Sequence, residues 1–156
     1  LVLCHLNAPQ KAVDQMVRLL RPGGRLVLVD MDLRDLFTMP PSASYAAFLD
    51  ECVIPYEAKI GVDYSVGMRL PQLAMDAGLR VDHVVADQPI FADGPGKHLW
   101  EKTFTAGIPR HVAEGVISED RDRELIAGME RHTARSDVWV AVAKMFAVVA
   151  SKPSTA

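Results

Sequence analysis

Apolar residues follow two different spacings along the chain, and the first thirty positions show both. Unbroken apolar runs at residues 1–6 and 26–29 predict two buried strands. Between these runs, residues 9–20 place apolar side chains on one face of a helix, which the Pro-Gly-Gly at 22–24 ends. This order makes a βαβ unit, so we expect the two strands to be parallel. Because the second run is apolar on both faces, we also expect helices above and below the sheet.

The middle of the chain continues with helices. Residues 30–44 have the composition of a loop, and helical spacing returns at 45–56. Pro55 lies inside that pattern and is expected to kink or end the helix. A further helix is expected over residues 70–77, with Gly78 as its stop.

The last part of the chain predicts two strands that are far apart in sequence. These strands are expected at residues 79–91 and 138–149, with two or three helices at 97–136 between them. One of these helices is expected to begin at Ser118. The long insertion lets the two strands pair as an antiparallel hairpin, and residues 151–156 are expected to fray.

Composition narrows the class of protein. The 156 residues fit one domain, and 49% of them are hydrophobic, which is enough for a core. The net charge of −3 and the lack of a basic run argue against nucleic acid as a partner. Cys4 and Cys52 are the two cysteines, so we expect no disulfide scaffold, no zinc cluster and a reducing, cytoplasmic location. We find no membrane span and no signal peptide in the sequence, so no membrane partner is expected.

Three segments carry a resemblance to a known family. Residues 19–30 read LLRPGGRLVLVD, residues 4–7 read CHLN, and residues 62–71 read VDYSVGMRLP, with Ala-Gly-Leu following at 77–79. Together they resemble class I S-adenosylmethionine-dependent methyltransferases from strand four onward. The resemblance implies an α/β fold, the C-terminal half of a Rossmann-like methyltransferase sheet. That half would be mostly parallel, with an antiparallel last strand and a helical insertion.

The same resemblance shapes the expected domain organisation. Residues 1–156 would be the C-terminal part of a methyltransferase domain, with the insertion at 93–136 as a lid over the substrate. The family binds S-adenosylmethionine mainly with strands one to three, so we expect the main cofactor loops to be absent from this chain. The chain has no initiator Met and opens within a predicted strand, which suggests part of a longer protein. Strand 1–6 would then be a bare edge, covered by the missing N-terminal half or by a second copy in a dimer.

Particular residues are candidates for roles in such a site. His5 is the candidate catalytic base, because imidazole titrates near neutral pH, and no metal ligands are expected. The cofactor pocket would be lined by Cys4, His5 and Leu6. The substrate would be bound by Asn7, Asp32, Tyr45, Tyr56, Tyr64 and Arg69.

Each assignment has a structural alternative. His5 could be a packing residue of the pocket wall, and Asp32, like Asp30, could cap a loop. The tyrosines at helical spacing could belong to the core, and Arg69 could pair with Asp63.

Two functions follow from these expectations. The first is methyl transfer by in-line displacement to a small molecule. The alternative is a catalytically incomplete half-domain that serves as a dimerisation or scaffold module. A nicotinamide-dependent Rossmann protein is disfavoured because the sequence holds no G-x-G-x-x-G motif.

Overall fold

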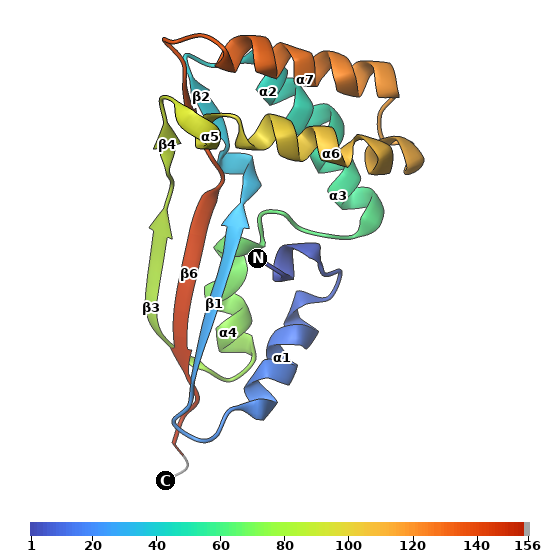
Figure 1. The fold of residues 1–156 in the computed structure, drawn as a ribbon. Coiled ribbons are helices and arrows are strands. Elements are labelled where there is room, and N and C mark those ends of the chain that lie inside the picture. Colours follow the sequence, from blue (N-terminus) through green and yellow to red (C-terminus); the bar gives the residue numbers. More distant parts are fainter. Residues whose placement is uncertain (155–156) are drawn as a thin grey trace. The chain divides into compact units, whose positions relative to one another are not determined.

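The chain forms two compact units in the computed structural model, which describes residues 1–154 (Figure 1). Unit 1 combines Leu1–Leu33 and Val62–Asp87 with the last strand, which starts at Lys144. Unit 2 combines Arg34–Gly61 with Gln88–Ala143. The predicted insertion at 93–136 lies inside unit 2. Each unit has its own three-stranded sheet.

The sheet of unit 1 has the last strand at its centre. Its strands are β1 (Arg25–Asp32), β3 (Arg80–Asp87) and β6 (Lys144–Ser151), in the order β1-β6-β3. Strand β6 is antiparallel to both neighbours, so the predicted antiparallel pairing of the last two strands is confirmed. The prediction of a mostly parallel sheet is wrong, because β6 lies between β1 and β3 and reverses both pairings.

The predicted strand at residues 1–6 is also wrong, because this segment forms a short 3₁₀ helix, η1 (Leu3–His5). The backbone N–H groups of Val2, Leu3 and Cys4 all donate to the carboxylate of Asp30. Three consecutive N–H groups that converge on one side chain form a turn. In a strand, successive N–H groups would point to opposite sides.

The helices of unit 1 lie close to those that the sequence predicts. They are α1 (Pro9–Leu19), η4 (Val66–Arg69) and α4 (Leu70–Asp76). After α1 the chain turns at Gly23, whose φ of 72° favours glycine. The ammonium group of Lys152 donates to the carbonyls of Val17 and Leu20 at the end of α1. The predicted fraying is therefore wrong at 151 and 152, while residues 155–156 lie outside the described part.

Helices cover one face of this sheet. Helix α4 contacts β1 and β6 (Figure 1). The side chains of Leu28, Val148 and Ala150, which share one face of the sheet, are buried. On the opposite face Val27 is 59% exposed and Val85 is 61% exposed. The prediction that helices lie above and below β1 is therefore wrong for the described residues, although its apolar residues point to both faces.

Unit 2 contains a smaller sheet that the sequence did not separate from the first. Its strands are β2 (Phe37–Met39), β4 (Ile90–Phe91) and β5 (Trp139–Ala141), in the antiparallel order β2-β5-β4. Each long predicted strand thus divides into two, one for each sheet. Strand β2 and a 3₁₀ turn, η2 (Leu33–Asp35), lie in the segment predicted as a loop.

Helices make up most of unit 2. The first run is α2 (Ala43–Phe48), a π-helical turn η3 (Leu49–Val53) and α3 (Ile54–Ile60). The second group is α5 (Gly94–Lys97), α6 (Leu99–Ala113) and α7 (Glu119–Thr133). Pro55 does not end the first run, because the wider π turn just before it accommodates the missing N–H. Ser118 caps α7 as predicted, since its hydroxyl accepts from the N–H of Arg121.

None of the helices in the described residues is both long enough and apolar enough to cross a membrane.

Candidate functional site

The N-terminal turn of unit 1 is anchored by a buried carboxylate. Asp30 Oδ2 accepts from the N–H groups of Val2, Leu3 and Cys4 at 3.1, 2.9 and 3.3 Å. The other oxygen accepts from Met31 N at 3.0 Å. Asp30 is fully buried, so these bonds are charge-assisted and shielded from water. The capping role considered for Asp30 is confirmed, and β1 positions the turn.

The predicted cofactor residues follow directly from this turn. Cys4 is fully buried, whereas His5 is exposed and Leu6 is half-buried. Burial, together with a hydrogen bond to Asp30, raises the pKa of the Cys4 thiol to about 12. The Cys4 side chain is therefore a neutral packing group near pH 7. Of these three predicted cofactor residues, His5 and Leu6 present side-chain surface to a ligand.

Tyr64 lies beside His5 in the same unit. The two rings meet edge to face, with centroids 5.5 Å apart and planes at 75°. The carbonyl of Tyr64 accepts from Leu33 N at 3.0 Å, which ties this loop to the end of β1. Gly67 permits the close approach, because a Cβ there would lie 2.7 Å from the carbonyl oxygen of Met31. The glycine therefore holds the loop that places Tyr64 next to His5.

The other predicted substrate residues of unit 1 differ in their surroundings. Asn7 is exposed after the turn, and Asp32 is buried at the end of β1. Arg69 donates to Asp63 at 3.1 Å, which confirms the predicted alternative for this arginine. Both partners reach solvent, so the pair contributes at most about 1 kcal/mol to stability.

Tyr45 and Tyr56 lie in unit 2, in a different unit from the other predicted substrate residues. Both are buried, which agrees with the core interpretation of the helical stripe. Tyr56 meets the ring of His111 edge to face at 5.2 Å. Burial, then the charge of Glu101, raises the pKa of Tyr45 above its ordinary range.

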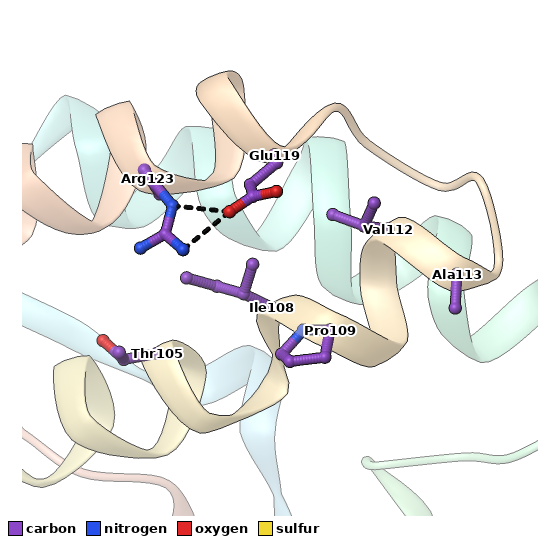
Figure 2. A pocket seen from close by; sticks show the side chains of 7 residues that line it. All are labelled: Thr105, Ile108, Pro109, Val112, Ala113, Glu119 and Arg123. Atoms are coloured by element: carbon purple, nitrogen blue, oxygen red, sulfur yellow. Dashed lines mark hydrogen bonds and ion pairs between the residues drawn. The ribbon is translucent and has the colours of Figure 1, made fainter.

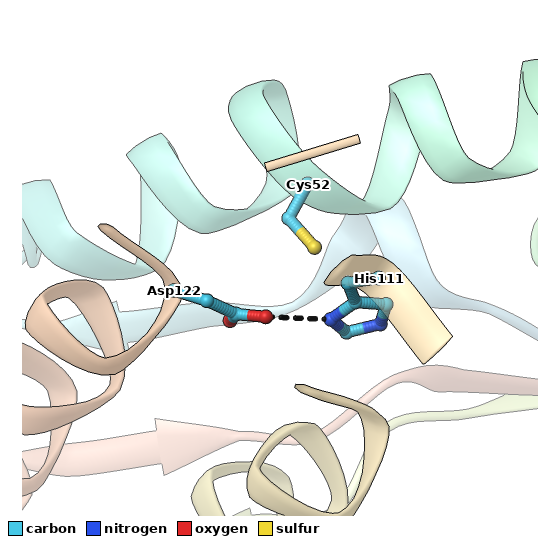
Figure 3. A group of neighbouring side chains, drawn as sticks. All are labelled: Cys52, His111 and Asp122. Carbon is cyan, nitrogen blue, oxygen red and sulfur yellow. Dashed lines mark hydrogen bonds and ion pairs between the residues drawn. The ribbon is translucent and has the colours of Figure 1, made fainter. Parts of the chain in front are cut away.

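Sequence analysis missed a buried cluster of Cys52, His111 and Asp122 in unit 2 (Figure 3). His111 Nδ1 and Asp122 Oδ2 are 3.0 Å apart, and one donor atom from each residue lies within 4.8 Å of the others. Burial, then the nearby Asp122 charge, raises the pKa of the Cys52 thiol to about 12. The three residues come from η3, α6 and α7, so no short spacing in the sequence marks the cluster.

Unit 2 also has a shallow pocket on its helices (Figure 2). The pocket measures about 400 Å³, and its apolar wall includes Ile108, Pro109 and Val112 of α6. On α7, Arg123 pairs with Glu119 at 2.6 Å beside this wall. The lining of the pocket is mostly apolar, and the two charged side chains at its edge pair with each other. It shows no group poised for catalysis.

Comparisons with known proteins agree with the resemblance found in the sequence. Residues 1–28 match the family described as Methyltransferase domain, and this match spans the N-terminal turn, α1 and the start of β1. An uncharacterized 37.1 kDa protein of transposon TN4556 from Streptomyces fradiae is 35% identical over 92 residues. That alignment covers 59% of this chain and 26% of the relative, so the chain spans about a quarter of that protein's length.

A solved structure shares the fold. It is a protein of Bacillus halodurans described as a candidate methyltransferase, with a TM-score of 0.53 and 16% sequence identity. The alignment covers 99% of this chain and 67% of the other. At this level of identity the likeness concerns the fold. The family match is confined to residues 1–28, whereas the likeness in fold extends over 99% of the chain.

Proposed function

We propose that the chain supplies part of an S-adenosylmethionine-dependent methyltransferase, which transfers a methyl group by in-line displacement to a small-molecule acceptor. One observation carries the proposal. The segment that matches the methyltransferase family includes the turn that Asp30 holds, with His5 exposed beside Tyr64. A titratable ring on an anchored turn suits proton transfer near a reacting atom.

The residues of unit 1 fit one wall of a cofactor pocket. His5 and Leu6 offer accessible side chains, while Asp30 is already occupied by four backbone N–H groups. The family resemblance attributes the remaining contacts to strands one to three. When bound, S-adenosylmethionine supplies the activated methyl group.

Within this proposal, the residues of unit 1 bind, orient and move a proton. His5 Nδ1 or Nε2 accepts the proton when the acceptor is a hydroxyl. The ring of Tyr64 meets the imidazole edge to face on one side. Asn7 is exposed next to His5 and offers an amide for a polar substrate group.

The test uses the protein expressed from its complete reading frame and S-adenosylmethionine with a labelled methyl group. We expect transfer to small acceptors, and His5→Ala should lower kcat about 10²- to 10⁴-fold with little change in the KM for the cofactor. His83→Ala, which changes an exposed histidine on β3, is the matched control and should keep full activity.

The outcomes separate the parts of this proposal. A wild-type protein that neither binds S-adenosylmethionine nor transfers its methyl group contradicts the function. Full activity of His5→Ala on a hydroxyl acceptor, with an unchanged pH profile, contradicts only the role of His5.

A second candidate function is association, and the exposed face of the unit 1 sheet favours it. Val27, Val29 and Val85 leave apolar surface open there, and such surface marks interaction sites. The occupant would be the N-terminal half of the methyltransferase domain or a second copy.

Val27→Lys should weaken self-association measured by light scattering, whereas Leu19→Lys, at an exposed position on α1, should not. A wild-type chain that stays monomeric up to about 100 μM, well above a typical 1 μM affinity, rules out the second copy.

A further inference from the structure

The buried cluster in unit 2 combines three side-chain types that bind metal ions. We propose that Cys52, His111 and Asp122 bind a divalent cation of the zinc class. A thiolate sulfur, an imidazole nitrogen and a carboxylate oxygen are all ligands that Zn²⁺ takes in proteins. One such atom from each residue lies within 4.8 Å of the other two, so small side-chain movements would bring them into one coordination sphere.

Asp122 provides an observation that is independent of this proximity. Its side chain is fully buried, and Oδ2 contacts His111 Nδ1 at 3.0 Å. Its other oxygen, Oδ1, is buried and has no hydrogen-bond partner among residues 1–154. A buried carboxylate oxygen without a partner costs stability, and a cation in the cluster would satisfy it.

The charges of the cluster balance a divalent ion. Binding would replace the thiol proton of Cys52 by a sulfur–metal bond and release that proton to solvent. One thiolate, one carboxylate and a neutral imidazole then carry two negative charges against two positive ones. A neutral sum suits an interior site, since an unbalanced buried charge is costly.

Two local features shape the space around the ligands. Cys52 lies in the π-helical turn η3, and π turns frequently occur at functional sites. Gly107, in the interior of α6, faces the ring of His111, and a Cβ there would lie 2.8 Å from Cε1 of that ring. A glycine inside a helix costs stability, so its benefit here is room for the imidazole.

The burial of the cluster determines the kind of site. Cys52 is fully buried, so a substrate cannot reach its sulfur for nucleophilic catalysis. A metal at this position would instead join η3, α6 and α7 across the core of unit 2. Structural zinc sites usually have four protein ligands, so with three a water molecule would complete the tetrahedron here. The proposal thus assigns a structural cation that stabilises unit 2, and it does not depend on methyl transfer.

The experiment measures Zn²⁺ binding to the full chain after treatment with a chelator. Competition with a chromophoric chelator gives the affinity, and elemental analysis gives the stoichiometry. We expect one Zn²⁺ per chain, with at least about 100-fold weaker binding in Cys52→Ser and in Asp122→Asn. Cys4→Ser is the matched control, because Cys4 is an equally buried cysteine in unit 1. The Zn²⁺ affinity of this variant should equal that of the wild-type chain.

A second measurement needs no variant and so avoids any loss of folding. Co²⁺ added to the wild-type chain should give a thiolate-to-metal charge-transfer band, and Zn²⁺ should raise the Tm until one equivalent is bound. A chain that retains no stoichiometric Zn²⁺ would overturn the proposal. Equal binding by Cys52→Ser and Cys4→Ser, or a Co²⁺ spectrum without a thiolate band, would overturn it as well.

Discussion

Asp30 Oδ2 accepts a hydrogen bond from the backbone N–H of Leu3 at 2.9 Å, across 27 positions of sequence. This bond, with those from the two neighbouring N–H groups, connects the end of β1 to the turn that presents His5. The geometry of the predicted catalytic residue therefore depends on a carboxylate that points away from solvent. Changing the charge of that carboxylate should change the turn first.

Replacing Asp30 by asparagine should loosen the N-terminal turn. The amide cannot supply a charged acceptor to three N–H groups, and a hydrogen bond to a charged group contributes about 1.5–3 kcal/mol. Amide hydrogen exchange at Leu3 and Cys4 should accelerate correspondingly. Asp76→Asn, at an exposed position on α4, should leave both amides protected. Unchanged exchange in Asp30→Asn would contradict the anchoring role.

Cys4 should stay protonated far into the alkaline range. Its folded pKa of about 12 lies above the ordinary value of 9.0, because burial and Asp30 disfavour the thiolate. The stabilisation from the protonated thiol is therefore complete below pH 9.0 and is lost as the pH rises toward 12. The native chain is alkylated at a series of pH values, and the modified Cys4 peptide is then measured by mass spectrometry. The rate of Cys4 alkylation should not rise near pH 9.0. In Asp30→Asn the rise should move to lower pH, and a native thiol that titrates normally would contradict this account.

Gly107→Ala should destabilise unit 2, although alanine is the better helix former by about 1 kcal/mol. The added Cβ would lie 2.9 Å from Nε2 of His111, so the ring must move away from position 107, which disturbs its contact with Asp122. We expect a net loss of about 1–3 kcal/mol in urea denaturation. Adding His111→Ala removes the clash, so the double variant should be more stable than the sum of the single effects predicts. Strict additivity would show that the ring is not the obstacle.

Ser118→Ala should lower the free energy of unfolding by about 1 kcal/mol. The hydroxyl of Ser118 accepts from Arg121 N at 3.3 Å and satisfies one of the free N–H groups at the start of α7. Thr103→Ala is the control, because Thr103 is exposed and its hydroxyl donates to the carbonyl of Leu99 in the same helix. A change in Thr103→Ala as large as in Ser118→Ala would rule out a specific capping effect.

Local signals in the sequence predicted the elements better than they predicted pairing. Helix α1, the stop at Gly78 and the cap at Ser118 each depend on a few neighbouring residues, and all three are confirmed. The strand at residues 1–6 failed because its apolar run gives no sign of the carboxylate of Asp30, which is far away in sequence. Likewise, an apolar run does not say which strand lies beside it, so the antiparallel position of β6 beside β1 was missed.

The residues of the candidate site show the same difference between local signals and contacts made across the sequence. The pairing of Arg69 with Asp63 and the core role of the tyrosine stripe could be predicted from spacing. The cluster of Cys52, His111 and Asp122 could not, because its members meet only through the packing of three helices.

The central position of β6 has a consequence for the order in which the protein folds during synthesis. Unit 2 ends at Ala143, so all of its strands and helices have been made before β6 begins. The sheet of unit 1 needs β6 between β1 and β3, and these two strands do not pair with each other. All of unit 2 is therefore synthesised before β6. Strands β1 and β3 can form the sheet of unit 1 only after β6 has been synthesised as well.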